Sequence, residues 1–307
     1  MNINDWFQMQ RPGFQVRFAL EAEHELMRLM EWVLACAPLV LHAHPERNLN
    51  LEEEDRLNNA VHRRLLGEPL SRIVGQVTFL DASIRVSKHV LVPRHETEWW
   101  LHEWIRTHPL TPDFNGFANP LTPDPSPKGE GGIYRWFLDI GTGSGAIAIA
   151  LCQAFPDIPM YASDISSAAL QVAQENMHLN AVVGIEWAEA DLWPDAWDQI
   201  FRESCGVMFA NLPYVPSKVI PTLDPEVREH DPQLALDGGS DGLDIIRRGV
   251  ERAESVLTSG SRMILEMGLG QSELLATWLR SRGRWEIAAI WPDLQGIPRA
   301  IEIERIA

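Results

Sequence analysis

The chain has 307 residues, of which 45% are hydrophobic, and a formal net charge of −17 at pH 7. Such a negative charge repels phosphate backbones and argues against a large nucleic-acid interface, although a local basic patch stays open. The three cysteines lie far apart, which argues against a disulfide framework or a zinc cluster and suits a reducing compartment. The N-terminus lacks the features of a signal peptide, and the most apolar run, residues 146–152, is shorter than the ~20 residues of a membrane span. We therefore expect a soluble cytoplasmic protein of two domains.

Residues 1–72 are predicted to form a helical domain, because their apolar residues recur at helical spacing. Residues 51–66 begin with acidic and end with basic side chains, which the helix dipole favours. Such a domain either only packs or recognises a substrate, and this segment alone favours packing. One expected helix, within residues 19–36, carries an apolar stripe of Leu20, Leu26, Met27, Met30, Val33 and Leu34.

Residues 73–95 are rich in β-branched side chains and predict a hairpin linker with Asp81-Ala82-Ser83 at its middle. Thr97 is expected to cap the helix that follows. Residues 108–132 are rich in proline and contain little that could be buried. We expect this segment to be a flexible, solvent-exposed insertion without a function of its own.

Within residues 96–307, strands and helices alternate from residue 136 onward. This alternation predicts an α/β domain with a Rossmann-like, doubly wound sheet that is mostly parallel and covered by helices on both faces. The last two strands follow one another without a helix between them, so one of them is expected to run antiparallel. The expected strands are 136–140, 159–164, 185–191, 207–211, 262–268, 285–291 and 299–306, and the expected helices are 146–155, 166–179, 243–257 and 271–281.

Gly141, Gly143 and Gly145 stand between the first of these strands and its helix. Glycines at such a junction permit a tight turn and let the backbone approach a ligand at the helix N-terminus. A plain strand-to-helix turn needs only one glycine, so three at alternate positions indicate a ligand-binding loop. The spacing G-T-G-S-G-A also fits the dinucleotide pattern G-x-G-x-x-A.

Three acidic residues bear on the choice of ligand. Asp139 precedes the first glycine by two residues, where its carboxylate can orient the loop and face the cationic methionine portion of S-adenosylmethionine; a pyrophosphate would be repelled there. Asp164 ends the second strand and can bind ribose hydroxyls in either cofactor. Asp191 ends the third strand, within reach of an adenine edge. Asp164 and Asp191 could instead be ordinary capping or loop acids.

The strand at 207–211 ends at Asn211, followed by Leu212, Pro213 and Tyr214. The side-chain oxygen of Asn211 can accept a hydrogen bond from a substrate –NH2 group. The carbonyl of Leu212 can accept the second hydrogen, since Pro213 restricts residue 212 to extended geometry, and Tyr214 can supply an aromatic wall. Two acceptors would hold a poorly nucleophilic amide nitrogen in line with a methyl donor. The alternative is a strand end with a proline turn.

Six motifs together resemble the glutamine methyltransferases that modify peptide chain release factors. The similarity runs from about Pro69 to the end and is interrupted by the insertion. It implies a helical N-terminal domain, a hairpin linker and a methyltransferase domain. It also implies methyl transfer from S-adenosylmethionine to the glutamine side-chain amide in the Gly-Gly-Gln loop of a release factor. The motifs are DIGTGSGAIAIAL, ASDIS, ANLPYV, DPQLALDGGSDGLDIIR, VLVPRHETE and WPDLQGIPRAIEIER.

The resemblance assigns roles by position. The segment from Asn211 to Tyr214 would hold the glutamine. Two departures from the family pattern stand out: Leu212 replaces the first proline of Asn-Pro-Pro-Tyr, and His95, expected in an exposed loop, replaces a proline of Pro-Arg-Pro-Glu-Thr-Glu. A backbone carbonyl is still present at residue 212, so the chemistry is expected to survive. Cofactor contacts would come from Gly141, Thr142, Gly143, Ser144, Gly145, Asp164, Asp191, Leu192 and Asn211.

Four other functions remain open. A glutamine methyltransferase acting on a ribosomal protein would have the same active site, although the LDGGSDGLDIIR segment and the C-terminus favour a release factor. An N6-adenine DNA methyltransferase would need a basic target-recognition domain, which is absent from the sequence pattern. A nicotinamide oxidoreductase leaves the Asn-Leu-Pro-Tyr turn unexplained, and a non-catalytic binding module would require a decayed site. The scattered histidines show no metal-ligand spacing, no membrane or nucleic-acid partner is expected, and a monomer is favoured.

Overall fold

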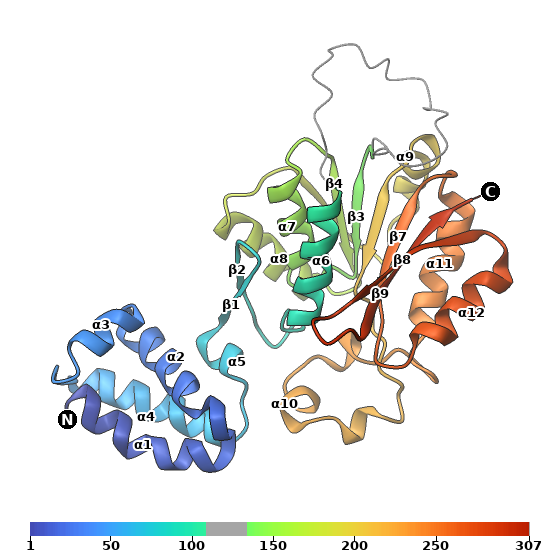
Figure 1. Cartoon of the computed structure of the whole chain (residues 1–307). Coiled ribbons are helices and arrows are strands. Elements are labelled where there is room, and N and C mark those ends of the chain that lie inside the picture. Colours follow the sequence, from blue (N-terminus) through green and yellow to red (C-terminus); the bar gives the residue numbers. More distant parts are fainter. Residues whose placement is uncertain (109–133, 307) are drawn as a thin grey trace.

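The structure is a computed structural model that describes residues 1–108 and 134–306. A lobe of short helices lies beside a larger domain built on a sheet (Figure 1). Within the described residues, no helix is both long enough and apolar enough to span a membrane. The lobe contains α1 (Ile3–Phe18), a 3-10 turn η1 (Ala19–Glu21), α2 (Ala22–Leu34), α3 (Pro38–Ala43), α4 (Leu51–Leu65) and α5 (Leu70–Val74).

The helical lobe has its own core, in which Trp6, Leu26 and Leu57 are fully buried. The apolar stripe expected within residues 19–36 is largely buried, but its first member is wrong. Leu20 lies in η1 and is fully exposed, because the chain leaves α1 at Ala19 with a positive φ of 47° and the next helix starts only at residue 22.

The linker hairpin consists of β1 (Gln76–Phe79) and β2 (Ala82–Arg85) in antiparallel pairing. Its turn is Leu80-Asp81, not the expected Asp81-Ala82-Ser83, because Phe79 and Ala82 already pair across the ladder. The outer edge of β2 is covered by the larger domain: the amides of Asn176 and Asn180 bond the backbone at residues 85 and 83 over 2.8–3.0 Å.

The sheet of the larger domain has the order β5-β4-β3-β6-β7-β9-β8. Strand order reverses between β3 and β6, which lie side by side and are parallel. The final strand, β9, runs antiparallel to both of its neighbours, as the two consecutive strands at the C-terminus predict. The mostly parallel sheet is therefore confirmed. Its strands are β3 (Phe137–Ile140), β4 (Met160–Asp164), β5 (Ile185–Glu189), β6 (Val207–Ala210), β7 (Arg262–Glu266), β8 (Trp285–Pro292) and β9 (Pro298–Arg305).

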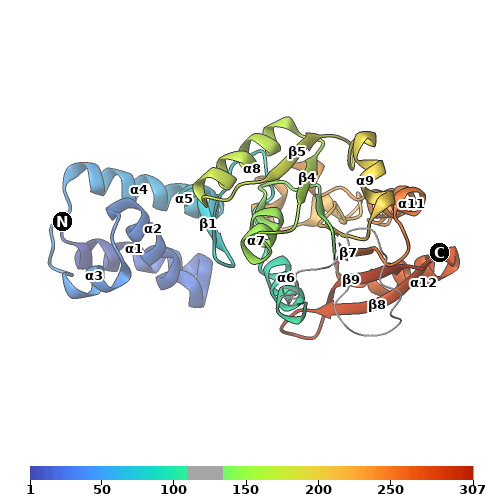
Figure 2. The same ribbon diagram turned by 90° about the horizontal axis from the view of Figure 1, so that it is seen from above.

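Helices cover both faces of this sheet (Figure 2). Side chains alternate along β6, so that Val207 and Phe209 pack with one set of helices while Met208 and Ala210 pack with the other. The first set is α6 (His95–Thr107), α7 (Ala146–Ala154) and α8 (Ser167–Leu179); the second is α9 (Asp198–Glu203), α11 (Asp244–Val256) and α12 (Ser272–Arg282). Short turns occupy the connections: η2 (Asp195–Trp197), η3 (Ile220–Thr222), α10 (Pro225–Arg228) and η4 (Gln233–Ala235).

Helix α6 begins earlier than expected. Its N-cap is Arg94, which is extended and caps without a side-chain bond, so Thr97 lies inside the first turn and is not the cap. His95 is the first helical residue and, although its side chain is almost fully exposed, it does not lie in a loop. The proline-rich insertion at 108–132 lies outside the described residues apart from His108.

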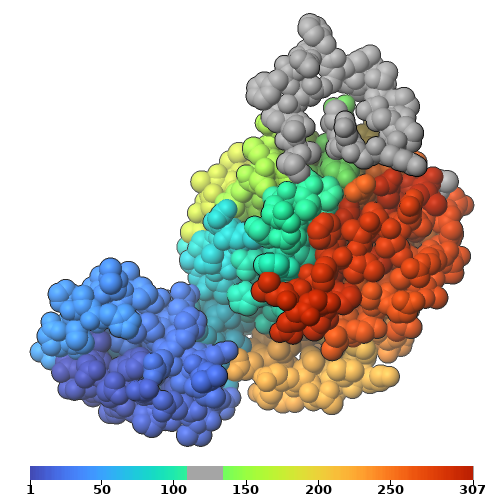
Figure 3. All heavy atoms as spheres, in the orientation of Figure 1, coloured from blue at the N-terminus to red at the C-terminus, as the bar shows by residue number. Residues whose placement is uncertain are grey.

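Ion pairs tie the helical lobe to the larger domain. Figure 3 shows the lobe (blue) meeting the rest of the molecule beside the linker (cyan) and the segment around α10 (light orange). Arg72 of α5 and Arg94 of the linker both bind the buried carboxylate of Asp231. Arg64 of α4 contacts Glu226 of α10 at 2.6 Å. The lobe is thus held against the chain that follows β6.

Candidate active site

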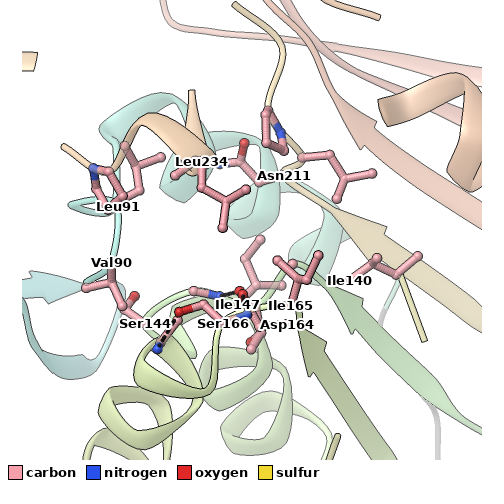
Figure 4. A pocket seen from close by; sticks show the side chains of 18 of the residues that line it. Val90, Leu91, Ile140, Ser144, Ile147, Asp164, Ile165, Ser166, Asn211 and Leu234 are labelled. Atoms are coloured by element: carbon pink, nitrogen blue, oxygen red, sulfur yellow. Dashed lines mark hydrogen bonds between the residues drawn. The ribbon is translucent and has the colours of Figure 1, made fainter. Parts of the chain in front are cut away.

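A cavity of about 380 Å³ opens at the carboxyl ends of β3, β4, β5 and β6. This is the edge of a doubly wound sheet at which ligands bind, next to the point where strand order reverses. The linker at residues 88–93 and the segment 232–237 complete the walls. In Figure 4, Asn211 and Leu234 lie across the cavity from Asp164 and Ser144.

The glycine loop has the backbone that its composition predicts. Gly141, Gly143 and Gly145 have φ values of 68°, 55° and 81°, a region that strongly favours glycine. A Cβ on Gly145 would also lie 3.1 Å from the Cβ of Ala173 in α8. The loop is held from below by Asn176, which donates to the Ser144 carbonyl over 2.9 Å and which the sequence analysis missed.

Asp139 lies beneath this loop and is not among the residues that line the cavity. It is 1% exposed and accepts hydrogen bonds from the Thr142 hydroxyl at 2.6 Å and the Ala148 amide at 3.3 Å. Burial raises the pKa of this carboxyl to about 7. Its Oδ1 atom has no hydrogen-bond partner within the described residues. A positive charge placed near the loop would stabilise the ionised form of Asp139, because opposite charges attract.

Asp164 lines the cavity at the end of β4 and is joined to the glycine loop. Its carboxylate accepts from the Gly143 amide at 2.9 Å and the Ser166 amide at 2.8 Å. Burial raises the pKa of Asp164 above its usual value. A carboxylate held at this point by two backbone donors can accept further hydrogen bonds from ligand hydroxyls.

Asp191 and Leu192 line the cavity beyond the end of β5. Asp191 is about half exposed and forms an ion pair with Arg248 of α11, which also lines the cavity. Leu192 has a positive φ of 71°, and its carbonyl accepts a hydrogen bond from the Ser163 hydroxyl. The backbone at this strand end is therefore fixed by a buried contact.

The ionisable groups around the cavity fit a cationic ligand better than a pyrophosphate. Asp139, Asp164 and Asp191 lie under or along its walls. Two positively charged side chains also line it: Arg248 is paired with Asp191, and Lys88 lies in the linker wall. A diphosphate at the loop would be repelled by the carboxylate of Asp164, which already binds the Gly143 amide. A sulfonium and an ammonium group would meet carboxylates, one of which has an unpartnered oxygen.

Asn211 follows β6 directly beside the glycine loop, since Ala210 pairs with Ile140. The Nδ2 group of Asn211 donates to the Thr97 hydroxyl oxygen over 3.1 Å. Its Oδ1 atom and the carbonyl of Leu212 accept no hydrogen bond from any residue that the structure describes. Both residues line the cavity, and that their oxygens bind a substrate –NH2 group stays a prediction.

The Leu212 side chain is buried in the core. It is 5% exposed and packs beneath the glycine loop, where a Cβ on Gly141 would lie 3.1 Å from its Cδ2 atom. On its other side lies Gly249 of α11. Leucine at this position therefore links the turn after β6 to the glycine loop by packing.

Pro213 lines the cavity, but Tyr214 does not. The Tyr214 hydroxyl instead donates to Glu266 at the end of β7 over 3.2 Å, behind the cavity. Its role as an aromatic wall stays a prediction. Glu266 and Thr97 were not assigned to the site from the sequence; the one signal was a carboxyl that follows the apolar run Met263-Ile264-Leu265.

The sheet order, the glycine loop after β3 and the Asn-Leu-Pro-Tyr turn after β6 define a Rossmann-like methyltransferase. The family model for the PrmC N-terminal domain matches residues 17–75, and that for the methyltransferase small domain matches residues 130–218. Among solved structures, the catalytic domain of hMettl16 in complex with a MAT2A 3′UTR hairpin is similar in fold, with a TM-score of 0.51 at 14% identity over 81% of this chain and 82% of that one.

Curated relatives extend this similarity over most of the chain. The release factor glutamine methyltransferase of Coxiella burnetii is 33% identical over 280 residues, which is 90% of each chain. That of Caulobacter vibrioides is 34% identical over 246 residues, 80% of this chain and 77% of the relative. The chain therefore belongs to the family of release factor glutamine methyltransferases, and the resemblance seen in its motifs is confirmed.

Proposed function

We propose that the chain transfers the methyl group of S-adenosylmethionine to the side-chain amide nitrogen of the glutamine in the Gly-Gly-Gln motif of a peptide chain release factor. The observation that carries this proposal is the pair of unpartnered acceptors, Asn211 Oδ1 and the Leu212 carbonyl, beside the glycine loop. A primary carboxamide carries two hydrogens on its nitrogen and matches two acceptors.

One set of residues is proposed to bind the cofactor and another to bind the substrate. Asp164 would bind the ribose hydroxyls, and Asp191 with Leu192 would flank the adenine. Asp139 would balance the positive charge of the methionine portion from beneath the loop. The remaining cofactor contacts would come from the backbone and side chains of Gly141, Thr142, Gly143, Ser144 and Gly145, and from Asn211.

Bound S-adenosylmethionine supplies an electrophilic methyl group. The amide nitrogen that must attack it is a poor nucleophile, because its lone pair is delocalised into the carbonyl. Asn211 and Leu212 would each accept one of its hydrogens and so fix the direction of the lone pair. They would also stabilise the positive charge that develops on nitrogen as the N–CH3 bond forms and the S–CH3 bond breaks. The nitrogen would then lose one of its two hydrogens to water as a proton, which leaves a neutral secondary amide. Pro213 would stiffen the turn that holds both acceptors, and Tyr214 would border the site.

The helical lobe, residues 1–72, is proposed to recognise the release factor, with residues 73–95 as linker and residues 96–307 as the methyltransferase domain. Support comes from the ion pairs of Arg64 and Arg72 with the segment after β6, since that segment also lines the cavity. A protein docked on the lobe would thus lie near the site. No direct nucleic-acid or membrane partner is proposed, and a monomer is favoured.

The test is incubation of the purified chain with release factors and labelled S-adenosylmethionine, followed by mass mapping of the modified residue. We expect one methyl group on the glutamine of the Gly-Gly-Gln motif. Asn211→Ala should lower transfer by ~10²–10³-fold while cofactor affinity stays within about an order of magnitude. Label found only on ribosomal proteins offered in parallel would favour a ribosomal substrate. Normal turnover by Asn211→Ala would remove that residue from the mechanism.

A further inference from the structure

A buried carboxylate behind the active site accepts hydrogen bonds from three side chains, two on helix α6 and one in the turn after β6. Glu266, at the end of β7, is 1% exposed. Its Oε2 atom accepts from the Thr97 hydroxyl at 2.6 Å and from the Trp100 indole at 2.8 Å. Its Oε1 atom accepts from the Tyr214 hydroxyl at 3.2 Å. None of these contacts is to the cavity itself, and only Thr97 lines it.

The polarity of this network is fixed by the chemistry of its members. The indole N–H of Trp100 can only donate, so the oxygen that it shares with Thr97 accepts from it, and the ionised carboxylate has no hydrogen to donate to Thr97. Thr97 has a single hydroxyl hydrogen, which it donates to that oxygen. Its own oxygen can then only accept, and the group of Asn211 that lies 3.1 Å away must be the –NH2.

The consequence for Asn211 is a defined amide orientation. Because its –NH2 group is bound to Thr97, its Oδ1 atom is turned away from the network and left as a free acceptor. A flipped amide would oppose two oxygens with no hydrogen between them and leave a buried polar contact unsatisfied. The two flipped orientations of an asparagine amide have nearly the same shape. A hydrogen-bond partner of known polarity, here Thr97, is what distinguishes them.

We propose that Glu266, acting through Thr97, is a positioning residue that keeps the Oδ1 acceptor of Asn211 directed at the substrate amide. The proposal rests on the proposed function, because it assigns Asn211 Oδ1 to a substrate –NH2 group. It concerns hydrogen-bond polarity and not charge. A glutamine at position 266 can present its carbonyl oxygen to Thr97 and Trp100 and its –NH2 to the Tyr214 hydroxyl, which preserves the direction of every bond toward Asn211.

Three variants and one control separate polarity from charge and from packing. Thr97→Val keeps the shape but removes the hydroxyl, whereas Thr97→Ser and Glu266→Gln keep the polarity. Glu302→Gln is the control: Glu302 is also a 1% exposed carboxylate on this sheet, and away from the cavity it accepts from the Trp291 indole at 3.1 Å and pairs with Arg262 at 2.8 Å. For each protein, kcat, the KM for release factor, the dissociation constant for S-adenosylmethionine and the melting temperature are measured.

We expect Thr97→Val to lower kcat at least about tenfold, because a preorganised acceptor is lost, with an unchanged dissociation constant for the cofactor. Thr97→Ser, Glu266→Gln and the control should keep kcat within about threefold and the wild-type pH profile. Wild-type kcat in Thr97→Val, or equal loss of cofactor binding, would overturn the proposal. Loss of kcat in Glu266→Gln but not in the control would make charge decisive and would also overturn it. Failure of the wild type to methylate any glutamine would instead contradict the proposed function.

Discussion

Three buried carboxyl groups in and behind this site have raised pKa values, which makes the site sensitive to pH. Burial raises the pKa of Asp139, Asp164 and Glu266 above their usual values. For Asp139 the shifted pKa is about 7, which is near physiological pH. In the free protein the folded state thus binds a proton that the unfolded state releases near pH 4. The contribution of Asp139 to stability is full below pH 4 and is lost as pH rises through 7.

Cofactor affinity is expected to depend on pH in the opposite sense. A cationic ligand near the glycine loop lowers the pKa of Asp139, so binding releases a proton near pH 7. Affinity for S-adenosylmethionine should therefore fall by about tenfold from pH 8 to pH 6, where most of the free protein carries that proton. Calorimetric titration in two buffers of different ionisation enthalpy measures both the affinity and the proton count.

Asp139→Asn is the control for this pH dependence. The asparagine oxygen can still accept from Thr142 and Ala148, so the loop should keep its shape while the titrating group is gone. Its affinity should be nearly constant between pH 6 and pH 8. Equal pH dependence in the two proteins would show that another group takes up the proton.

At the level of secondary-structure elements, the loop and turns around the cavity are held both by local sequence motifs and by contacts between distant parts of the chain. Only the local motifs can be recognised in the sequence. The glycine loop and Asn211 could be predicted, because each follows a buried strand and bears a chemical signature. The connection from Asn211 through Thr97 to Glu266 could not, since Thr97 and Glu266 are 169 positions apart and meet only when α6 packs on the sheet. A threonine near a helix start also satisfies the sequence preference for a cap, which is why its role was misassigned.

The same difference between local pattern and tertiary context explains which helices and strands could be predicted from the sequence. Strands β3 to β9 and their helices follow from alternation of apolar segments, and the structure confirms them. Helix α1 was not anticipated as an element, and it contains Pro12, a residue that usually ends helices. The exposure of Leu20 follows from a single left-handed residue, Ala19. Apolar spacing carries no information about such a backbone break.

Packing of Leu212 against the glycine loop yields a prediction at the level of these elements. Leu212→Ala keeps the backbone carbonyl but leaves a cavity between Gly141 and α11, so the free energy of unfolding should fall by about 2–4 kcal/mol. Cofactor affinity should fall too, because Gly141 loses its support. Urea unfolding and calorimetric titration measure the two effects. Leu274→Ala is the control, since Leu274 lies on α12 and is 56% exposed; equal losses in both variants would contradict this account.

Across the whole molecule, charge pairing joins the helical lobe to the wall of the cavity. Asp231 is 8% exposed and lies next to Pro232, which lines the cavity together with Leu234. Its carboxylate binds Arg72 from the lobe and Arg94 from the linker. Two guanidinium nitrogens of Arg72 have no hydrogen-bond partner in the described part of the chain, so its charge depends strongly on Asp231.

Removal of Asp231 should therefore loosen the lobe and the cavity wall together. Asp231→Ala leaves the guanidinium of Arg72 buried without its carboxylate, and such a change costs about 3–5 kcal/mol. We expect faster hydrogen exchange in residues 224–237 and a higher KM for the release factor, because the wall facing the substrate is no longer anchored. Asp157→Ala, at an exposed position, is the control. Exchange and KM equal to those of the control would mean that the lobe and the cavity wall are held independently of this ion pair.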